Sequence, residues 1–201
     1  PVQYLFGYYD CAGGSGTGGS GSIWQSSTAF VDSGLQPNKC YGYKVQARDS
    51  ATALNTTASS TQSEEYTLAN VPGAPTLNTG TLSTLTLTND ENGNPSATPV
   101  TKFAVQITGT TPTDSTWLNK WVDGSGNPSV AEVWLTDAQL DGLVINGLQI
   151  GTTYEAKSKA RNEDTTETAL SSLGSGATLA DTTPPSPNPM TFASLTPAAN
   201  S

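Results

Sequence analysis

The chain has 201 residues, a net charge of −9 and a pI near 4.2, with eight Lys and Arg residues and no His. A nucleic-acid-binding surface needs clustered cations, so we expect no nucleic acid partner. No apolar run reaches the roughly 18 residues of a membrane-spanning helix, so we expect no membrane insertion. Without His, the usual Ser–His–Asp and Cys–His catalytic arrangements are excluded. We therefore expect no catalytic residue, no cofactor and no transition-metal site.

The chain opens with an apolar, aromatic segment that alternates like a β-strand. Val2, Tyr4, Phe6 and Tyr8 fall on one face of this segment. Such a strand is not expected to stand alone as an exposed edge, so it needs cover from another part of a fold. The Gly-rich stretch 12–22 follows it. Because this stretch lies between two strand-like runs, we interpret it as a loop inside a module.

The second half of the chain contains enough alternating segments for seven strands. The segments 83–88 and 101–108 alternate apolar and polar residues, and a polar turn with Gly and Pro separates them. Short strands joined by turns predict an all-β fold, with nearly no helix. The remaining strand-like segments are 131–135, 142–147, 153–161 and, more weakly, 165–180.

One motif occurs twice. Residues 35–48 read LQPNKCYGYKVQAR and residues 148–161 read LQIGTTYEAKSKAR, so that Leu, Tyr, Ala and Arg recur 113 residues apart. A Leu, a turn and a Tyr that opens a strand form the pattern of a tyrosine corner, in which the phenol hydroxyl holds a loop against the edge of a sandwich. We predict that Tyr41 and Tyr154 occupy equivalent corners of two β-sandwich modules in tandem.

The two modules differ in completeness. Residues 2–9 align with 101–108, the third strand of the second module. We therefore expect residues 1–69 to form an incomplete module that lacks its first strands. Residues 70–180 form a complete module. Residues 181–201 are predicted to be a Pro-rich linker followed by the opening strand of a further module.

The tail carries apolar residues that could cover the incomplete module of another copy. Met190, Phe192 and Leu195 are available for burial, and the prolines before them keep the linker extended. We expect the tail to act as a donor strand for the apolar run at the start of the next copy. This contact is heterologous and extends into a filament. In the alternative, the chain is cut from a longer tandem array, and the same contacts join covalently consecutive modules.

The corner motif and the linkers NVPGAPT and DTTPPSPNP resemble those of fibronectin type III repeats. The resemblance is closest to repeats of large secreted or surface-anchored bacterial and archaeal proteins, in which phrases like SIWQSSTAFVDSGLQPN and YKVQARD recur. It implies tandem fibronectin type III-like (immunoglobulin-like) β-sandwiches at an extracellular or cell-surface location. It does not specify function, because such modules serve as spacers, adhesins, enzyme appendages and assembly units.

The resemblance also implies a disulfide. In a fibronectin-like sandwich, the strand before Cys11 and the strand that Cys40 opens are neighbours in one sheet. A bond between them closes a loop of about 30 residues and stabilises the fold by about 3.5 kcal/mol on the chain-entropy model. It fits an extracellular protein. The alternative is a pair of buried free thiols.

Several further residues are candidate ligand or modification sites. The acidic segments 89–94 and 162–164 offer oxygen atoms to calcium, although they lack the spacing of an EF-hand and read more simply as polar turns. Asn55 begins the sequon Asn-Thr-Thr and is a candidate glycosylation site. The tryptophans are candidates for sugar stacking, for contact with a neighbouring module or for core packing; they are Trp24, Trp117, Trp121 and Trp134.

The sequence therefore predicts an extracellular structural repeat, with copies of itself and glycans as candidate partners. The first hypothesis is a subunit of a surface fibre joined head-to-tail by strand complementation. The second is a spacer or carbohydrate-binding accessory module of a secreted multidomain hydrolase or adhesin. An assembly unit polymerises when isolated, whereas an accessory module stays monomeric and, if it is a lectin, binds polysaccharide.

Overall fold

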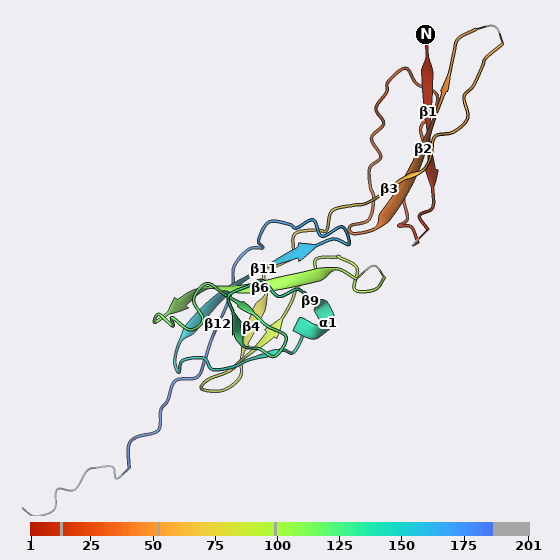
Figure 1. Cartoon of the computed structure of the whole chain (residues 1–201). Coiled ribbons are helices and arrows are strands. Elements are labelled where there is room, and N and C mark those ends of the chain that lie inside the picture. The colour runs from red at the N-terminus through yellow and green to blue at the C-terminus, as the bar shows by residue number, and fades with distance from the viewer. Residues whose placement is uncertain (13, 52, 99, 187–201) are drawn as a thin grey trace, which may run out of the picture.

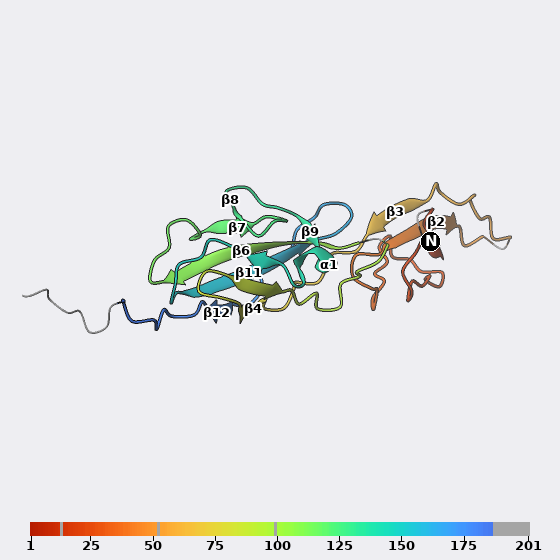
Figure 2. The same ribbon diagram turned by 90° about the horizontal axis from the view of Figure 1, so that it is seen from below.

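The computed structural model describes residues 1–12, 14–51, 53–98 and 100–186. Its strands form two groups that lie end to end, and the exposed residues that follow the last strand lead away from the second group (Figures 1 and 2). The apolar tail residues Met190, Phe192 and Leu195 lie outside the described residues. None of the helices in the described part has the length and hydropathy of a membrane span.

The first module is a single antiparallel sheet. Tyr, Phe and Val dominate its two long strands, as is typical of half-buried β-structure. The neighbouring strands β1 and β2 pair over their whole length from Gln3↔Arg48 to Tyr9↔Gly42. The order in the sheet is β1 (Gln3–Tyr9), β2 (Cys40–Arg48) and β3 (Ser63–Tyr66).

The second module is a sandwich of two antiparallel sheets, which confirms the predicted all-β, β-sandwich fold class. One sheet has the order β10 (Val144–Ile145), β5 (Leu85–Thr88) and β4 (Thr76–Thr79). The other has the order β12 (Gly174–Ala177), β11 (Thr153–Arg161), β6 (Lys102–Thr111), β7 (Lys120–Val122) and β8 (Pro128–Ser129), with β9 (Leu135–Thr136) also paired to β6.

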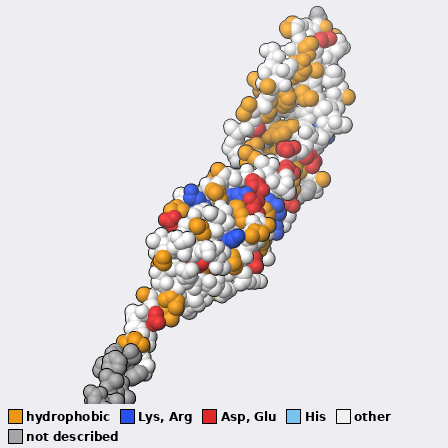
Figure 3. All heavy atoms as spheres, turned by 60° about the vertical axis from the view of Figure 1, so that its left-hand side comes forward, with side chains coloured by type: hydrophobic (Ala, Val, Ile, Leu, Met, Phe, Trp, Pro, Cys, Tyr) orange, Lys and Arg blue, Asp and Glu red, His pale blue; other side chains and the backbone are white. Residues whose placement is uncertain are grey.

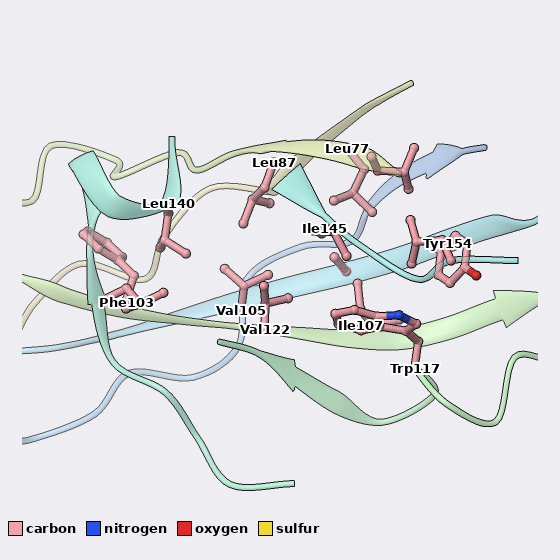
Figure 4. Close-up of a cluster of buried hydrophobic side chains, with 14 of the residues drawn as sticks. Leu77, Leu87, Phe103, Val105, Ile107, Trp117, Val122, Leu140, Ile145 and Tyr154 are labelled. Carbon is pink, nitrogen blue, oxygen red and sulfur yellow. The ribbon is translucent and has the colours of Figure 1, made fainter. Parts of the chain in front are cut away.

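The hydrophobic core lies between these two sheets (Figure 4). Leu85 and Leu87 alternate inward from β5, and Val105 and Ile107 alternate inward from β6. All four side chains are almost completely buried. This alternation is the period of two that the sequence showed in both segments. Trp117 is also fully buried, and its indole Nε1 donates a hydrogen bond to the carbonyl of Asn146 (3.1 Å).

A single helical turn, α1 (Asp137–Leu140), interrupts the β-structure. Thr136 precedes it, and the backbone N–H of Thr136 donates to Oε1 of Gln139 (3.0 Å), which is half of a capping box. Leu140 is fully buried in the core. The turn places Asp137 and the following Asp141 at the end of β5, where both contact Asn89.

The pairing register relates the two modules. In the first module Tyr4 pairs with Ala47, and in the second Phe103 pairs with Ala160. Ala47 and Ala160 belong to the repeated motif, so β1 corresponds to β6 and β2 corresponds to β11. Phe6 therefore takes the place of Val105, and Tyr8 takes the place of Ile107. Among the described residues, the first module has no strands that correspond to β4 and β5.

Candidate functional site

Both repeated tyrosines form a corner. The hydroxyl of Tyr41 accepts a hydrogen bond from the backbone N–H of Gln36 (2.9 Å), and that of Tyr154 accepts one from Gln149 (2.7 Å). Each donor lies five residues before its tyrosine. This is the geometry expected of a tyrosine corner, in which a loop is held against the start of a strand.

The second bond of each tyrosine hydroxyl differs between the modules. Tyr154 donates to Oδ2 of the buried Asp114 (2.7 Å), and burial together with this hydrogen bond raises the pKa of Tyr154 above its usual value. Tyr41 donates to the backbone carbonyl of Thr17 (2.7 Å) in the Gly-rich stretch. Gly16 packs so closely on Tyr41 that a Cβ there would overlap the phenol group. The described part of the Gly-rich stretch is therefore an ordered loop of the first module.

Cys11 and Cys40 are joined in a disulfide, as predicted. The bond connects the residue just beyond β1 to the first residue of β2, and both cysteines are buried. Glu64 lies beside them, and these three residues are the only group of potential metal ligands within 4.8 Å of one another in the described part of the chain. Because the sulfur atoms are bonded to each other, this group is not a metal site.

An open apolar groove of about 410 Å³ lies on one face of the first module. Phe6 forms its floor with Tyr43, and Phe30 stacks on Phe6 at 5.7 Å between ring centroids. A smaller hollow of about 180 Å³ adjoins the groove, since it shares Phe6, Tyr43 and Ser63. Figure 3 shows hydrophobic side chains along this module. The other residues that line the groove are Asp32, Leu35, Tyr41, Ser63, Glu65, Tyr66 and Thr67.

The groove occupies the position at which the second module is covered by β4 and β5. There, Val105 packs in one cluster with Leu77, Leu85 and Leu87 (Figure 4). Phe6, its equivalent, remains partly exposed. The hydrophobic core cluster begins at Ala69, so no residue from the sheet of the first module belongs to it. The first module therefore presents a sheet face that lacks its covering strands among the described residues.

Of the four predicted contact residues in β1 and just before it, only Phe6 lines the groove. Tyr8 packs beside it, with its ring centroid 6.1 Å from that of Tyr41 and 5.9 Å from that of Tyr43. Tyr4 pairs through its backbone with Gln25 on the free edge of β1, and Val2 is about half exposed. The structure thus places Tyr4, Phe6 and Tyr8 on one strand, and of these only Phe6 lines the groove.

One carboxylate lies in the wall of the groove. Asp32 accepts a short hydrogen bond from the Tyr43 hydroxyl (2.6 Å) and two more from the backbone and side chain of Ser20. Partial burial acts to raise the pKa of Asp32, but these bonds outweigh it and hold the pKa below its usual value. Burial and the Asp32 carboxylate raise the pKa of Tyr43. The pair is one polar point of the groove, whose lining also includes Ser63, Glu65 and Thr67.

A polar junction joins the modules, and sequence reasoning missed it. Asn38 is fully buried; its Nδ2 donates to Oγ1 of Thr101 (2.9 Å), and its Oδ1 accepts from the backbone N–H of Glu163 (2.8 Å). Asn162 donates in turn to the carbonyl of Thr67 (3.2 Å). These bonds fix one module against the other. The repeated motif already marked Asn38 as unusual. Asn38 occupies the position of Gly151, and both residues adopt a positive φ (46° and 62°), which is uncommon for a residue other than Gly.

The partly exposed tryptophans stack on cations of their own module. Arg48 lies 4.4 Å from the ring centroid of Trp24, and Arg161 lies 4.6 Å from that of the equivalent Trp134. Lys159 lies between Trp121 and Trp134. One face of each ring is therefore taken up by a cation. Of the three sequence interpretations, core packing is found for Trp117, which is fully buried.

Asn55, the candidate glycosylation site, is exposed in the first module. Its side chain and backbone N–H both donate to the carboxylate of Asp49 (2.9 and 3.1 Å). The exposure is compatible with modification. A glycan on this amide would displace the contact with Asp49.

No protein-family model matches this chain, and no curated protein matches it in sequence. Among solved structures, the FN1–FN3 domains of chicken CNTN1 align with 89% of this chain at 12% sequence identity and a TM-score of 0.37. The alignment covers 54% of that chain, so this chain spans about half its length.

Proposed function

We propose that this chain is an extracellular structural unit that assembles head-to-tail through its incomplete first module. The observation that carries the proposal is the open groove at the position where the second module is covered by β4 and β5. A fibronectin type III-like fold and the Cys11–Cys40 disulfide are compatible with an extracellular domain.

The proposed occupant of the groove is the tail of another copy. Residues 181–186 lead away from the second module and are exposed (Figure 1). In the sequence beyond them, Met190 and Phe192 alternate as the side chains of an added strand would. In strand addition, main-chain pairing and alternate side-chain pockets supply the affinity, and the aromatic groove would provide such pockets. Donor and acceptor lie in different parts of the chain, so the contact repeats without closing.

No observation favours the carbohydrate-binding alternative. Sugar rings bind on open aromatic faces, and the described tryptophans with exposed surface each have one face against a cation. Half of the ten residues that line the groove are Phe or Tyr, whose rings suit the apolar side chains of an added strand. Strand addition fits this lining better.

The test compares the full chain with a deletion of residues 188–201 by sedimentation velocity over a range of concentrations. We expect the full chain to form concentration-dependent polymers and the deletion to remain monomeric. Phe192→Asp should abolish assembly, whereas Thr191→Asp, on the opposite face of the expected strand, adds the same charge and should have a much smaller effect. A synthetic peptide of residues 188–201 should cap the full-length polymers.

Two results would contradict the proposal. Equal assembly of the deletion and the full chain would remove the tail as donor. A full chain that stays monomeric at all concentrations would favour completion of the first module by a covalently attached neighbour over assembly between copies.

A further inference from the structure

A cluster of oxygen atoms lies at the beginning of the loop between β5 and β6. Asn89 follows β5 directly. Its backbone N–H donates to Oδ1 of Asp141 (2.8 Å), and its Nδ2 donates to Oδ1 of Asp137 (2.9 Å). Asp137 opens the helical turn α1, and Asp141 follows it. The fold thus brings Asn89 into contact with two carboxylates that are about fifty residues away in sequence.

Two oxygen atoms in this region are buried and have no hydrogen-bond donor. They are Oδ1 of Asn89 and Oε2 of Glu91, and the Asn89 residue is only 7% exposed. A buried acceptor without a donor is destabilising, so such an atom calls for a partner that hydrogen bonds within the fold do not supply. A half-turn of the Asn89 carboxamide would point its Oδ1 toward Asp137, where its nitrogen now lies.

The region also carries uncompensated negative charge. Asp90 and Glu91 follow Asn89 directly, so the loop adds two carboxylates to those of Asp137 and Asp141, which Asn89 contacts. The two ion pairs within the described ranges both belong to Lys159, so no Lys or Arg described there neutralises this group.

We propose that Asn89, Glu91, Asp137 and Asp141 form a calcium site. The donors are carboxylate and carboxamide oxygens, which are the ligands of hard cations, and there is no nitrogen or sulfur donor for a transition metal. Calcium accepts irregular arrangements of oxygen atoms, whereas Mg²⁺ requires a nearly octahedral one. In the described chain the three carboxylates are not all within 4.8 Å of one another, so binding would draw the Glu91 side chain toward the two aspartates.

The loop that carries the proposed site also contacts the junction between the two modules. Asn94, in the same loop, exchanges two hydrogen bonds with the backbone of Asn70 in the intermodule linker (2.7 and 2.9 Å). The carbonyl of Asp90 accepts from the N–H of Gly73 (3.0 Å). At the far end of the loop, Thr101 contacts Asn38 of the first module. A cation that orders this loop therefore stiffens the connection between the two modules.

The experiment is a calorimetric titration of the full chain with CaCl₂ and, separately, with MgCl₂. We expect calcium to bind with a Kd of about 10⁻⁴–10⁻³ M, the range of extracellular modules, and magnesium to bind at least about tenfold more weakly. Calcium at about 10 mM should raise the Tm of the second module by about 6–12 °C. Glu91→Gln should weaken calcium binding at least about tenfold, whereas Glu155→Gln, an exposed carboxylate on β11, should leave it unchanged.

Asp141→Asn provides a second variant, because its amide oxygen still accepts from the N–H of Asn89 while a charge is removed. If circular dichroism shows that Glu91→Gln does not fold, calcium binding by Asp141→Asn tests the proposal in its place. The proposal is wrong if the full chain gives no binding heat and no change in Tm. It is also wrong if calcium and magnesium act equally, or if a folded variant binds like the unchanged chain, since these results indicate general charge screening. The site is independent of the assembly proposal.

Discussion

The two modules share a strand register but differ in what covers the equivalent face of the sheet. β1 and β2 pair as β6 and β11 do, and both modules have a tyrosine corner in the same place. In the second module a complete opposing sheet covers the shared face, and Val105 and Ile107 are almost completely buried. In the first module the equivalent face carries Phe6 and Tyr8 and is open.

The comparison teaches how a sheet remains ordered without its partner sheet. The first module replaces small aliphatic residues with aromatic rings, which pack on one another at centroid distances from 5.7 to 6.4 Å. It also adds a disulfide and an ordered Gly-rich loop. The second module has neither cysteine nor such a loop and depends on apolar burial between its sheets. Three predictions test this contrast.

Reduction of the Cys11–Cys40 disulfide should have the largest effect, and it should be confined to the first module. The loss is about 3.5 kcal/mol on the chain-entropy model, which is large for a sheet with one open face. Hydrogen exchange followed by mass spectrometry should show faster exchange in β1 and β2 and unchanged exchange in β6 and β11. In a Cys11→Ala/Cys40→Ala double variant, reductant should change nothing further. Unchanged exchange in β1 after complete reduction would disprove a stabilising role of the bond.

Truncation on the sheet face that the two modules share should affect them unequally. Ile107→Ala removes a fully buried side chain between two sheets and should cost about 3 kcal/mol. Phe6→Ala, on the partly exposed face, should cost about 1–2 kcal/mol although it removes more atoms, because the groove already admits water. Chemical denaturation measures both. Equal or reversed losses would mean that the first module is as well covered as the second.

Removal of the two corner hydroxyls should give the smallest effects. Tyr154→Phe leaves Oδ2 of the buried Asp114 without its donor, while Oδ1 keeps the bond from the N–H of Thr116, and should cost about 2 kcal/mol. Tyr41→Phe frees the carbonyl of the exposed Thr17, which water can reach, and should cost about 1 kcal/mol or less. Thermal unfolding of both variants gives the comparison. A larger loss for Tyr41→Phe would show that the Gly-rich loop depends on this bond more than the exposure of Thr17 suggests.

Much of the fold could be predicted from local sequence patterns. Alternation with a period of two identified the segments that became β5, β6 and β11, because one face of each strand is buried. The repeated Leu–turn–Tyr motif located both corners, because all atoms of a corner lie within a few residues. The one-turn helix α1 was missed, since four residues are too few to show a helical period.

The groove was only partly predictable. The apolar alternation of residues 2–8 indicated a strand in need of cover, yet it did not show that Phe6 lines the groove whereas Tyr4, two residues earlier on the same strand, does not. Phe30 and Asp32 belong to a stretch without regular structure, and no periodicity places them opposite Phe6 and Tyr43. Their position depends on how the loop folds back over the sheet.

The sequence by itself determined the fold class, the positions of the main strands, the two corners and the likeness of the two modules, because these depend on burial patterns and turns that are short in sequence. Only the tertiary structure decided the contacts between distant segments. Asn38 meets Thr101 and Glu163, which are 63 and 125 residues away, and Asn89 meets Asp137 and Asp141 across 48 and 52 residues. Such polar contacts leave no periodic pattern in the sequence, because each one satisfies a single donor or acceptor that folding removes from water.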